Sequence, residues 1–177
     1  RVVVPPDYAE INIWLKHNAP TAKVLVLPRQ PYVTCYQWLS GTCTAGPVST
    51  VLLDNPQIIY PESGFYAGDP VLQDFYRLLS PTQPEELSKF FDFFGVDYVL
   101  VQNDVVGGAG RDGVYSPAET TRLIAGLDYL APIKSFGKLD LYVNRQRRTQ
   151  PEVYSAKRYR TVEGDSPTLL DKMLLTY

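Results

Sequence analysis

Apolar residues recur along the chain with two different periods, and these periods predict helices that alternate with strands. Residues 24–27 and 96–101 form short, mainly apolar runs, which are typical of strands covered on both faces of a sheet. Four other segments carry apolar residues three and four positions apart, which predicts helices. These helices are expected over 7–18, 70–80, 84–94 and 117–131.

The rest of the chain gives weaker patterns. Alternating apolar and polar residues predict a hairpin over 133–143. Residues 30–68 are rich in Pro, Tyr, Thr and Gly and are expected to be mainly loops. Short strands are expected at 51–53 or 57–60 and at 153–162, before a last helix over 166–174.

This order of elements indicates an α/β fold. We expect a layered sandwich with a mixed, mainly parallel central sheet that is flanked by helices and completed by a C-terminal antiparallel hairpin. The runs 24–27 and 96–101 should be adjacent in that sheet, because both need cover on two sides. We expect one domain over residues 1–177. Because the chain opens at Arg1 without Met or a signal peptide, we interpret it as an excised fragment or a mature product.

Composition excludes several classes of protein. The 177 residues include 13 Tyr and 7 Phe, which is too aromatic for a disordered chain. The apolar runs are far shorter than the ~20 residues that a membrane-spanning helix needs. A net charge of −2 argues against nucleic acid as a partner.

Charge is unevenly distributed along the chain. Residues 54–104 are mainly acidic, whereas residues 134–160 are mainly basic. The basic side chains are either a solvated surface, which we favour, or a contact for anionic lipid headgroups or a lipid-linked phosphate. Those concerned are Arg145, Arg147, Arg148, Lys157, Arg158 and Arg160.

The two cysteines, Cys35 and Cys43, are eight positions apart. They are either a disulfide, which would stabilise the chain by about 2.5 kcal/mol, or two separate buried thiols of the kind usual in cytosolic proteins. We favour the disulfide. With a single His, the chain lacks enough ligands for a zinc site. We therefore predict no metal site and no cofactor.

One glycine motif and one histidine are candidates for chemistry. Gly108, Gly110 and Gly113 spell GxGxxG, but the expected helix begins after the last glycine instead of within the motif. We interpret this segment as a loop. His17 is expected to be structural or exposed at the end of the first helix, where a positive charge is favoured.

Four carboxylates, Asp69, Asp74, Asp104 and Asp112, could meet in the fold, although solvated surface acids are the favoured interpretation. Asp104 is the best single candidate, because sites in α/β folds gather at the carboxyl ends of strands.

Aromatic residues crowd the irregular segment. They serve either to pack a long loop, which we favour, or to stack on sugar rings. For the sugar-binding alternative, Trp38 is the first choice, Tyr36 and Tyr66 are second choices, and Asp69 would accept hydrogen bonds from sugar hydroxyls.

Several short sequence motifs, taken in their order along the chain, resemble the large extracytoplasmic domain of multispanning GT-C-type glycosyltransferase-like membrane proteins, including the YfhO-like family. The motifs are Pro6-Asp-Tyr8, Val24-Leu-Val-Leu-Pro28, Tyr36-Gln-Trp38, Asp69-Pro70 and Phe94-Gly-Val-Asp-Tyr-Val-Leu-Val101 followed by Asn103-Asp104. The resemblance covers most of the chain.

The resemblance implies a soluble accessory domain on the extracytoplasmic face of the cell membrane. Its implied partners are glycan or a polyprenyl-phosphate-linked sugar, and the membrane would be reached through helices outside this chain. The carboxylate essential for transfer in such enzymes usually lies between membrane helices, so this chain is expected to be non-catalytic. The alternatives are a free-standing α/β hydrolase that uses Asp104 or Asp112, and a non-catalytic protein-interaction domain.

Overall fold

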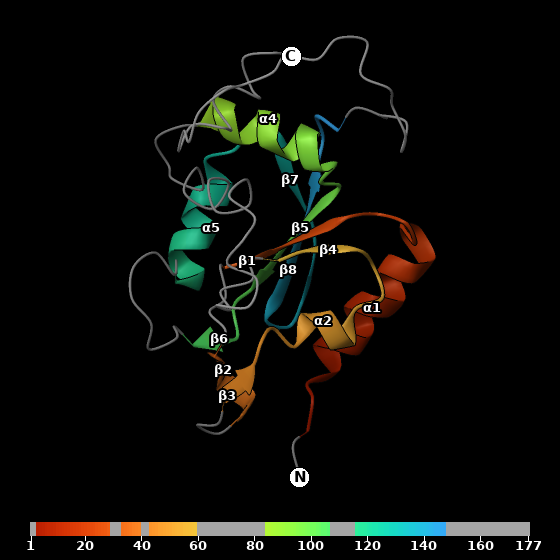
Figure 1. Cartoon of the computed structure of the whole chain (residues 1–177), viewed down its shortest axis with the longest axis vertical. Helices are drawn as coiled ribbons and strands as arrows, with labels where there is room; N and C mark the ends of the chain where they lie inside the picture. The colour runs from red at the N-terminus through yellow and green to blue at the C-terminus, as the bar shows by residue number, and fades with distance from the viewer. Residues whose placement is uncertain (1–2, 29–32, 40–42, 60–83, 107–115, 148–177) are drawn as a thin grey trace, which may run out of the picture.

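The computed structural model describes residues 3–28, 33–39, 43–59, 84–106 and 116–147. Its helices are α1 (Pro6–Asn18), α2 (Ser49–Leu52), α4 (Pro84–Phe94) and α5 (Pro117–Ala125), with a short 3-10 helix at Gln37–Leu39 (Figure 1). Its strands are β1 (Val24–Leu27), β2 (Val33–Tyr36), β3 (Cys43–Ala45), β4 (Gln57–Ile58), β5 (Tyr98–Gln102), β6 (Val105–Val106), β7 (Leu130–Phe136) and β8 (Leu139–Asn144).

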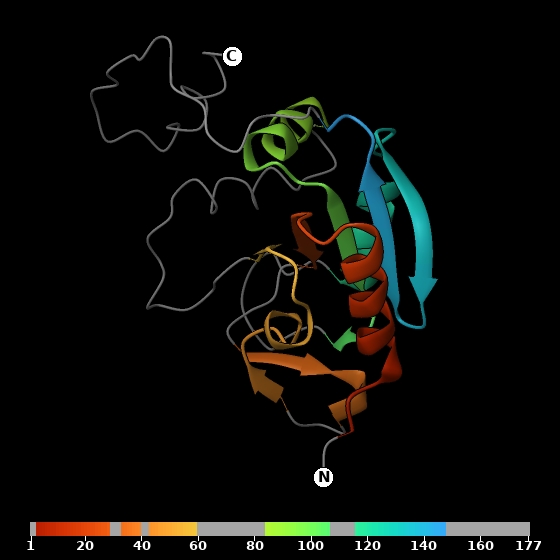
Figure 2. The same ribbon diagram turned by 90° about the vertical axis from the view of Figure 1, so that its right-hand side faces the viewer.

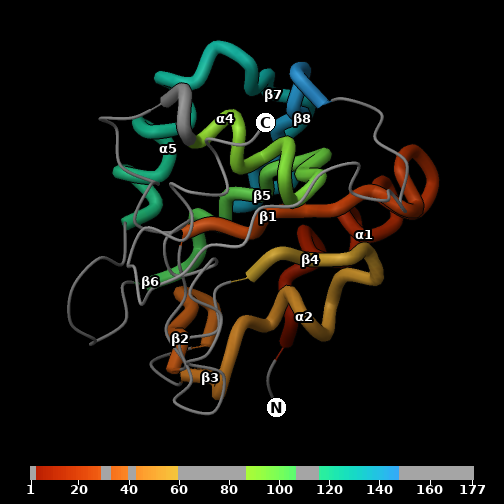
Figure 3. The backbone as a smooth tube through the Cα atoms, turned by 45° about the horizontal axis from the view of Figure 1, so that its top comes forward, coloured from red at the N-terminus to blue at the C-terminus, as the bar shows by residue number. Residues whose placement is uncertain are grey.

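The central sheet has five strands in the order β4-β1-β5-β8-β7 (Figure 3). β1 is parallel to both β4 and β5, whereas β8 is antiparallel to β5 and to β7. Four of the strands therefore run in one direction and only β8 runs in the other. The predicted mixed, mainly parallel sheet with an antiparallel hairpin is confirmed, as is the adjacency of its two apolar runs.

Both faces of β1 are buried, which explains its continuous apolar run. Val24 and Val26 pack with α1, while Leu25 and Leu27 pack with α4 and α5 on the opposite face. Figure 2 shows α1 in front of the sheet and α5 behind it. The fold is thus a three-layer α/β/α sandwich in which the sheet is the middle layer.

The carboxylate of Asp97 joins three chain segments at the start of β5. The backbone N–H of Lys23 donates to Asp97 Oδ2 at 2.7 Å, and Arg147 forms an ion pair with the other oxygen. Asn144, at the end of β8, donates its backbone N–H to the Asp97 carbonyl oxygen at 2.9 Å. Asp97 therefore fixes where β1, β5 and β8 begin or end relative to one another, and Arg147 is not a free cation for lipid phosphate.

A second sheet, in the order β3-β2-β6, lies at the end of the molecule where β5 finishes (Figure 1). Cys35 and Cys43 lie opposite each other on β2 and β3 and are joined by a disulfide. Because β6 follows β5 after only two residues, the chain passes directly from the central sheet into this smaller one.

Two local predictions are corrected by the structure. The helix predicted over 117–131 ends at Ala125, because Gly126 caps it and the chain then enters β7 at Leu130, which pairs with Asn144. The apolar residues after Gly126 still enter the core, but as part of a turn and a strand. The strand alternative at 51–53 is also wrong, since α2 covers Val51 and Leu52, and β4 falls within the other alternative, 57–60.

Other predictions fall outside the described residues. These are the helix over 70–80, the glycine motif at 108–113, the strand over 153–162 and the helix over 166–174.

The start of α1 is held against the tip of the β7–β8 hairpin. Asp7, in the first turn of α1, accepts a hydrogen bond from the backbone N–H of Lys138 at 3.0 Å. Gly137 has a φ of 55°, and a Cβ atom on it would lie 2.0 Å from an oxygen of the Asp7 carboxylate. The contact therefore requires glycine for its backbone conformation and for the space it leaves.

We predict that Gly137→Ala destabilises the fold more than Gly95→Ala. Both glycines have positive φ, but a Cβ on Gly95 would meet only ordinary contacts, with Lys23. Backbone strain should cost each variant roughly 1–2 kcal/mol, and displacement of Asp7 should cost Gly137→Ala about 1 kcal/mol more. Urea unfolding measures both values. In an Asp7→Ala background the excess should vanish, and an excess that persists there would contradict the assignment.

Candidate functional site

The predicted strand-end acid and the predicted stacking residue meet in one buried cluster. Trp38 lies on the 3-10 helix after β2, and its indole N–H donates to Asp104 Oδ2 at 2.7 Å. The Tyr8 hydroxyl, from α1, donates to the same oxygen at 2.9 Å. The side-chain amide of Gln102 donates to the Tyr8 hydroxyl oxygen at 3.0 Å. We call these four residues the Asp104 cluster.

Burial dominates the electrostatics of this cluster. Asp104 is only 2% exposed, and this burial raises the pKa of its carboxyl above the usual range, because the charged form loses its hydration. Burial also raises the pKa of the Tyr8 hydroxyl, with a further contribution from the nearby Asp104 charge. In the described structure Asp104 is thus enclosed and hydrogen-bonded to Tyr8 and Trp38. Its role as a strand-end acid for catalysis stays a prediction.

Two of the sugar-stacking candidates lie beside this cluster. Tyr36 is 2% exposed, and its hydroxyl oxygen accepts a hydrogen bond from the backbone N–H of Val48 at 3.0 Å. Its ring packs inside the domain, and its role in sugar binding stays a prediction. Trp38 is half-buried between Tyr36 and Tyr8, with ring centroids 5.4 and 6.1 Å away. Packing is what the structure shows for Trp38, and its role in sugar binding stays a prediction. Tyr66 and Asp69 lie outside the described residues.

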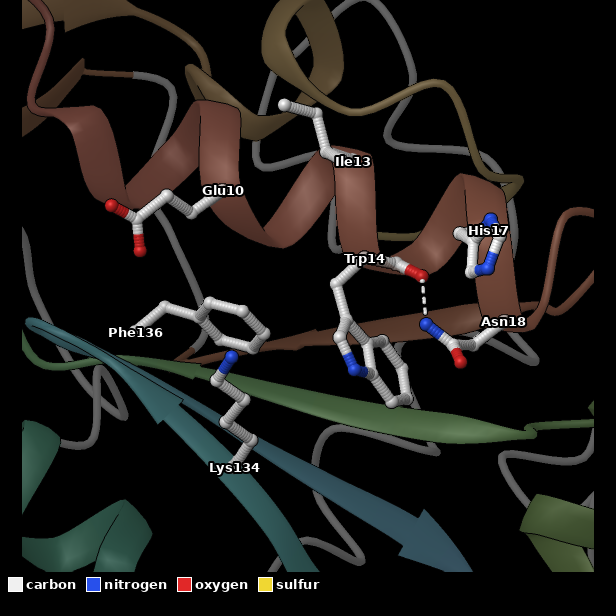
Figure 4. A pocket seen from close by; sticks show the side chains of 7 residues that line it. All are labelled: Glu10, Ile13, Trp14, His17, Asn18, Lys134 and Phe136. Carbon is white, nitrogen blue, oxygen red and sulfur yellow. Dashed lines mark hydrogen bonds between the residues drawn. The ribbon is translucent and has the colours of Figure 1, made fainter.

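Apart from the Asp104 cluster, an open pocket of about 370 Å³ lies between α1 and β7 (Figure 4). We call it the α1–β7 pocket. α1 and β7 supply its lining, which comprises Glu10, Ile13, Trp14, His17, Asn18, Lys134 and Phe136.

Aromatic rings form the floor of the α1–β7 pocket. The Trp14 ring makes edge contacts with Tyr98 and Phe136, with centroids 6.1 and 6.4 Å away. The Lys134 ammonium lies 4.7 Å from the centroid of the Phe136 ring, within the range of a cation–π interaction. The Asn18 side-chain amide donates to the Trp14 carbonyl oxygen at 2.8 Å.

The pocket offers groups for binding. It presents ring surface, a carboxylate, an ammonium group and an amide side by side, without a paired nucleophile and base. Within the described ranges, no three His, Cys, Asp or Glu side chains gather as a metal site. In the same residues, no helix has the length and apolar content that crossing a bilayer requires.

Sequence reasoning missed this pocket, although one of its walls leaves a signal. Glu10, Ile13, Trp14 and His17 recur at helical spacing and so share one side of α1. Two of them are large apolar residues outside the buried stripe, and Ile13 is exposed. The other wall comes from β7, more than a hundred residues later, and no local pattern shows that the two elements meet.

Comparison with known proteins finds likeness in structure only. No family model and no curated protein matches the sequence. Arabinofuranosyltransferase AftD from Mycobacteria matches with a TM-score of 0.61 and 15% identity, over 80% of this chain and 12% of AftD. A mutant of AftD matches with a TM-score of 0.63 and 15% identity, over 80% of this chain and 13% of that one.

A weaker match is the C-terminal globular domain of an oligosaccharyltransferase from Archaeoglobus fulgidus, with a TM-score of 0.44 and 16% identity, over 80% of this chain and 99% of that chain. This likeness is too slight to support an inference.

The comparison with AftD is a likeness in fold. The present chain spans about one eighth of AftD's length, and an identity of 15% carries no statement about substrate. It confirms the resemblance found in the sequence: the fold expected of a domain in a glycosyltransferase-like protein is the fold that the chain adopts.

We predict that the stability of the wild type falls relative to Asp104→Asn as pH rises. Asn keeps an acceptor oxygen for Tyr8 and Trp38 but does not titrate. Because the pKa of Asp104 is raised in the folded state, the folded protein retains a proton that the unfolded chain releases above its ordinary pKa of about 3.9. Raising the pH from there through the folded-state pKa therefore favours unfolding of the wild type. Urea unfolding across this pH series tests the prediction, which a pH-independent difference would contradict.

Proposed function

We propose that this chain is an extracytoplasmic accessory domain of a membrane glycosyltransferase-like protein and that it contacts glycan without catalysing sugar transfer. The observation that carries the proposal is the fold shared with a small part of an arabinofuranosyltransferase. A segment of that size within a much longer enzyme is suited to presenting or positioning a substrate. Glycan or a polyprenyl-phosphate-linked sugar is the partner that the sequence resemblance implies.

The disulfide supports the extracytoplasmic location. Cys35 and Cys43 are the only cysteines in the chain, and they are joined to each other. Disulfides persist in oxidising compartments and are rare in the cytosol. The bond is therefore expected to have formed outside the cytoplasm.

The state of the acids supports a non-catalytic role. Asp104, which would serve a free-standing hydrolase, is enclosed by Tyr8 and Trp38. Asp112, the other acid suggested for a hydrolase, lies outside the described residues. The α1–β7 pocket provides binding groups in place of a reacting pair.

Ligand-observed NMR tests glycan contact. Purified chain mixed with neutral arabinofuranosyl and hexopyranosyl oligosaccharides should give saturable binding at millimolar concentration, in keeping with a small, open site. The same oligosaccharides without protein, and with an unrelated α/β protein, serve as controls. The absence of binding by every oligosaccharide would contradict the proposal. The chain should also transfer no sugar from a polyprenyl-phosphate-linked donor, and measurable transfer would refute the non-catalytic part.

Labelling in intact cells tests location. Val51 is 84% exposed on α2, so Val51→Cys should react with a membrane-impermeant maleimide in cells that produce the chain with its flanking segments. Permeabilised cells give the total reactive thiol, and the wild type gives the background. Reaction only after permeabilisation would place the domain on the cytoplasmic side.

A further inference from the structure

We infer that the α1–β7 pocket binds one neutral sugar ring of a glycan, with Trp14 as its stacking surface and Glu10 and Lys134 as partners for its hydroxyls. This inference rests on the proposed glycan contact and moves that contact away from Trp38.

Trp14 and Trp38 are both half-buried, but their surroundings differ. Trp14 contacts Tyr98 and Phe136 at interplanar angles of 84° and 65°, so neither ring lies flat on the indole. Trp38 is wedged between Tyr8 and Tyr36, with its N–H committed to Asp104. The apolar face of a sugar ring needs a flat, apolar partner, and Trp14 is the tryptophan that lines the α1–β7 pocket.

The polar groups around Trp14 suit hydroxyls. Glu10 and Lys134 are exposed, and within the described part of the chain neither has an ion-pair partner. Figure 4 shows the Lys134 amine and the indole nitrogen of Trp14 on the same side of the pocket, with the Glu10 carboxylate farther along α1. The hydroxyls of a sugar ring both donate and accept hydrogen bonds, so they can pair with an ammonium group, an indole N–H and a carboxylate together.

Charge and size define the class of ligand. One carboxylate, one ammonium group and the imidazole of His17 line the same pocket, so a sugar acid would gain from Lys134 and lose to Glu10. A volume of about 370 Å³ is at the lower end of the range for small-molecule sites, which suits one ring of a longer glycan. An apolar peptide side chain fits poorly, because it would desolvate both charged groups without replacing their hydrogen bonds.

The two tryptophans allow a direct test. The chain contains only Trp14 and Trp38, so a ¹H–¹⁵N spectrum shows two indole N–H signals, and loss of one in Trp14→Phe assigns both. Titration of the wild type with neutral methyl hexosides and methyl arabinofuranoside should shift the Trp14 signal and leave the Trp38 signal unchanged. A shift confined to Trp38 would overturn the inference.

Substitutions on the exposed rim test the hydroxyl partners without touching the core. Glu10→Gln and Lys134→Gln should each weaken binding by up to about tenfold, the equivalent of one hydrogen bond to a charged group. Lys138→Gln changes the other lysine of the same hairpin, outside the pocket lining, and should bind as the wild type does. Circular dichroism confirms that each variant is folded.

The outcomes separate this inference from the proposed function. If the wild type binds glycan and the pocket variants bind equally well, the assignment of binding to the α1–β7 pocket is wrong, and the proposed glycan contact stands. If the wild type binds no saccharide, both fail. If methyl glucuronide binds more tightly than methyl glucoside, the assignment to a neutral ring is wrong.

Discussion

The parallel pairing of β1 with β5 is the constraint on which the rest of this fold depends. Leu25 pairs with Val99 and Leu27 with Val101, and all four side chains are buried. Because both strands bury both faces, neither can lie at a solvent-exposed surface, so helices must cover the sheet on both sides. Asp97 sets the start of this pairing by binding the backbone N–H of Lys23. The position of α1, and with it one wall of the α1–β7 pocket, follows from that register.

The Asp104 cluster holds the smaller sheet in place against the central sheet. Its hydrogen bonds connect α1, through Tyr8, with the 3-10 helix that carries Trp38. The disulfide-linked strands are thereby attached to the body of the domain through a buried carboxylate. A buried acid at the end of a strand therefore has a structural role in this fold, because it holds Tyr8 and Trp38 together.

The sequence was sufficient for the parts of the fold whose signals are local. The apolar runs of β1 and β5 each lie within a few consecutive residues. The structure shows two further local signals, the positive φ of Gly95 directly after α4 and the capping box that Ser116 and Glu119 form at the start of α5. The sequence predicts too long a helix at α5, because residues after Gly126 keep an apolar pattern that fits a helix as well as a turn and a strand. The α1–β7 pocket was not predictable, because its walls meet only through the register of the sheet. Tyr36 shows the same limit, since composition cannot separate an aromatic that packs from one that binds.

The irregular register of β7 bears on how the domain behaves beside other copies of itself. β7 is the outermost strand on its side of the described sheet, and its pairing with β8 shifts between Pro132 and Lys134. An outermost strand with a regular backbone can recruit another strand and extend the sheet from one molecule to the next. Proline lacks the N–H that such pairing needs, and the shift breaks the even spacing of the remaining groups. The same few residues that place Lys134 at the pocket therefore also hinder association along this edge, which favours a domain that stays dispersed at high local concentration.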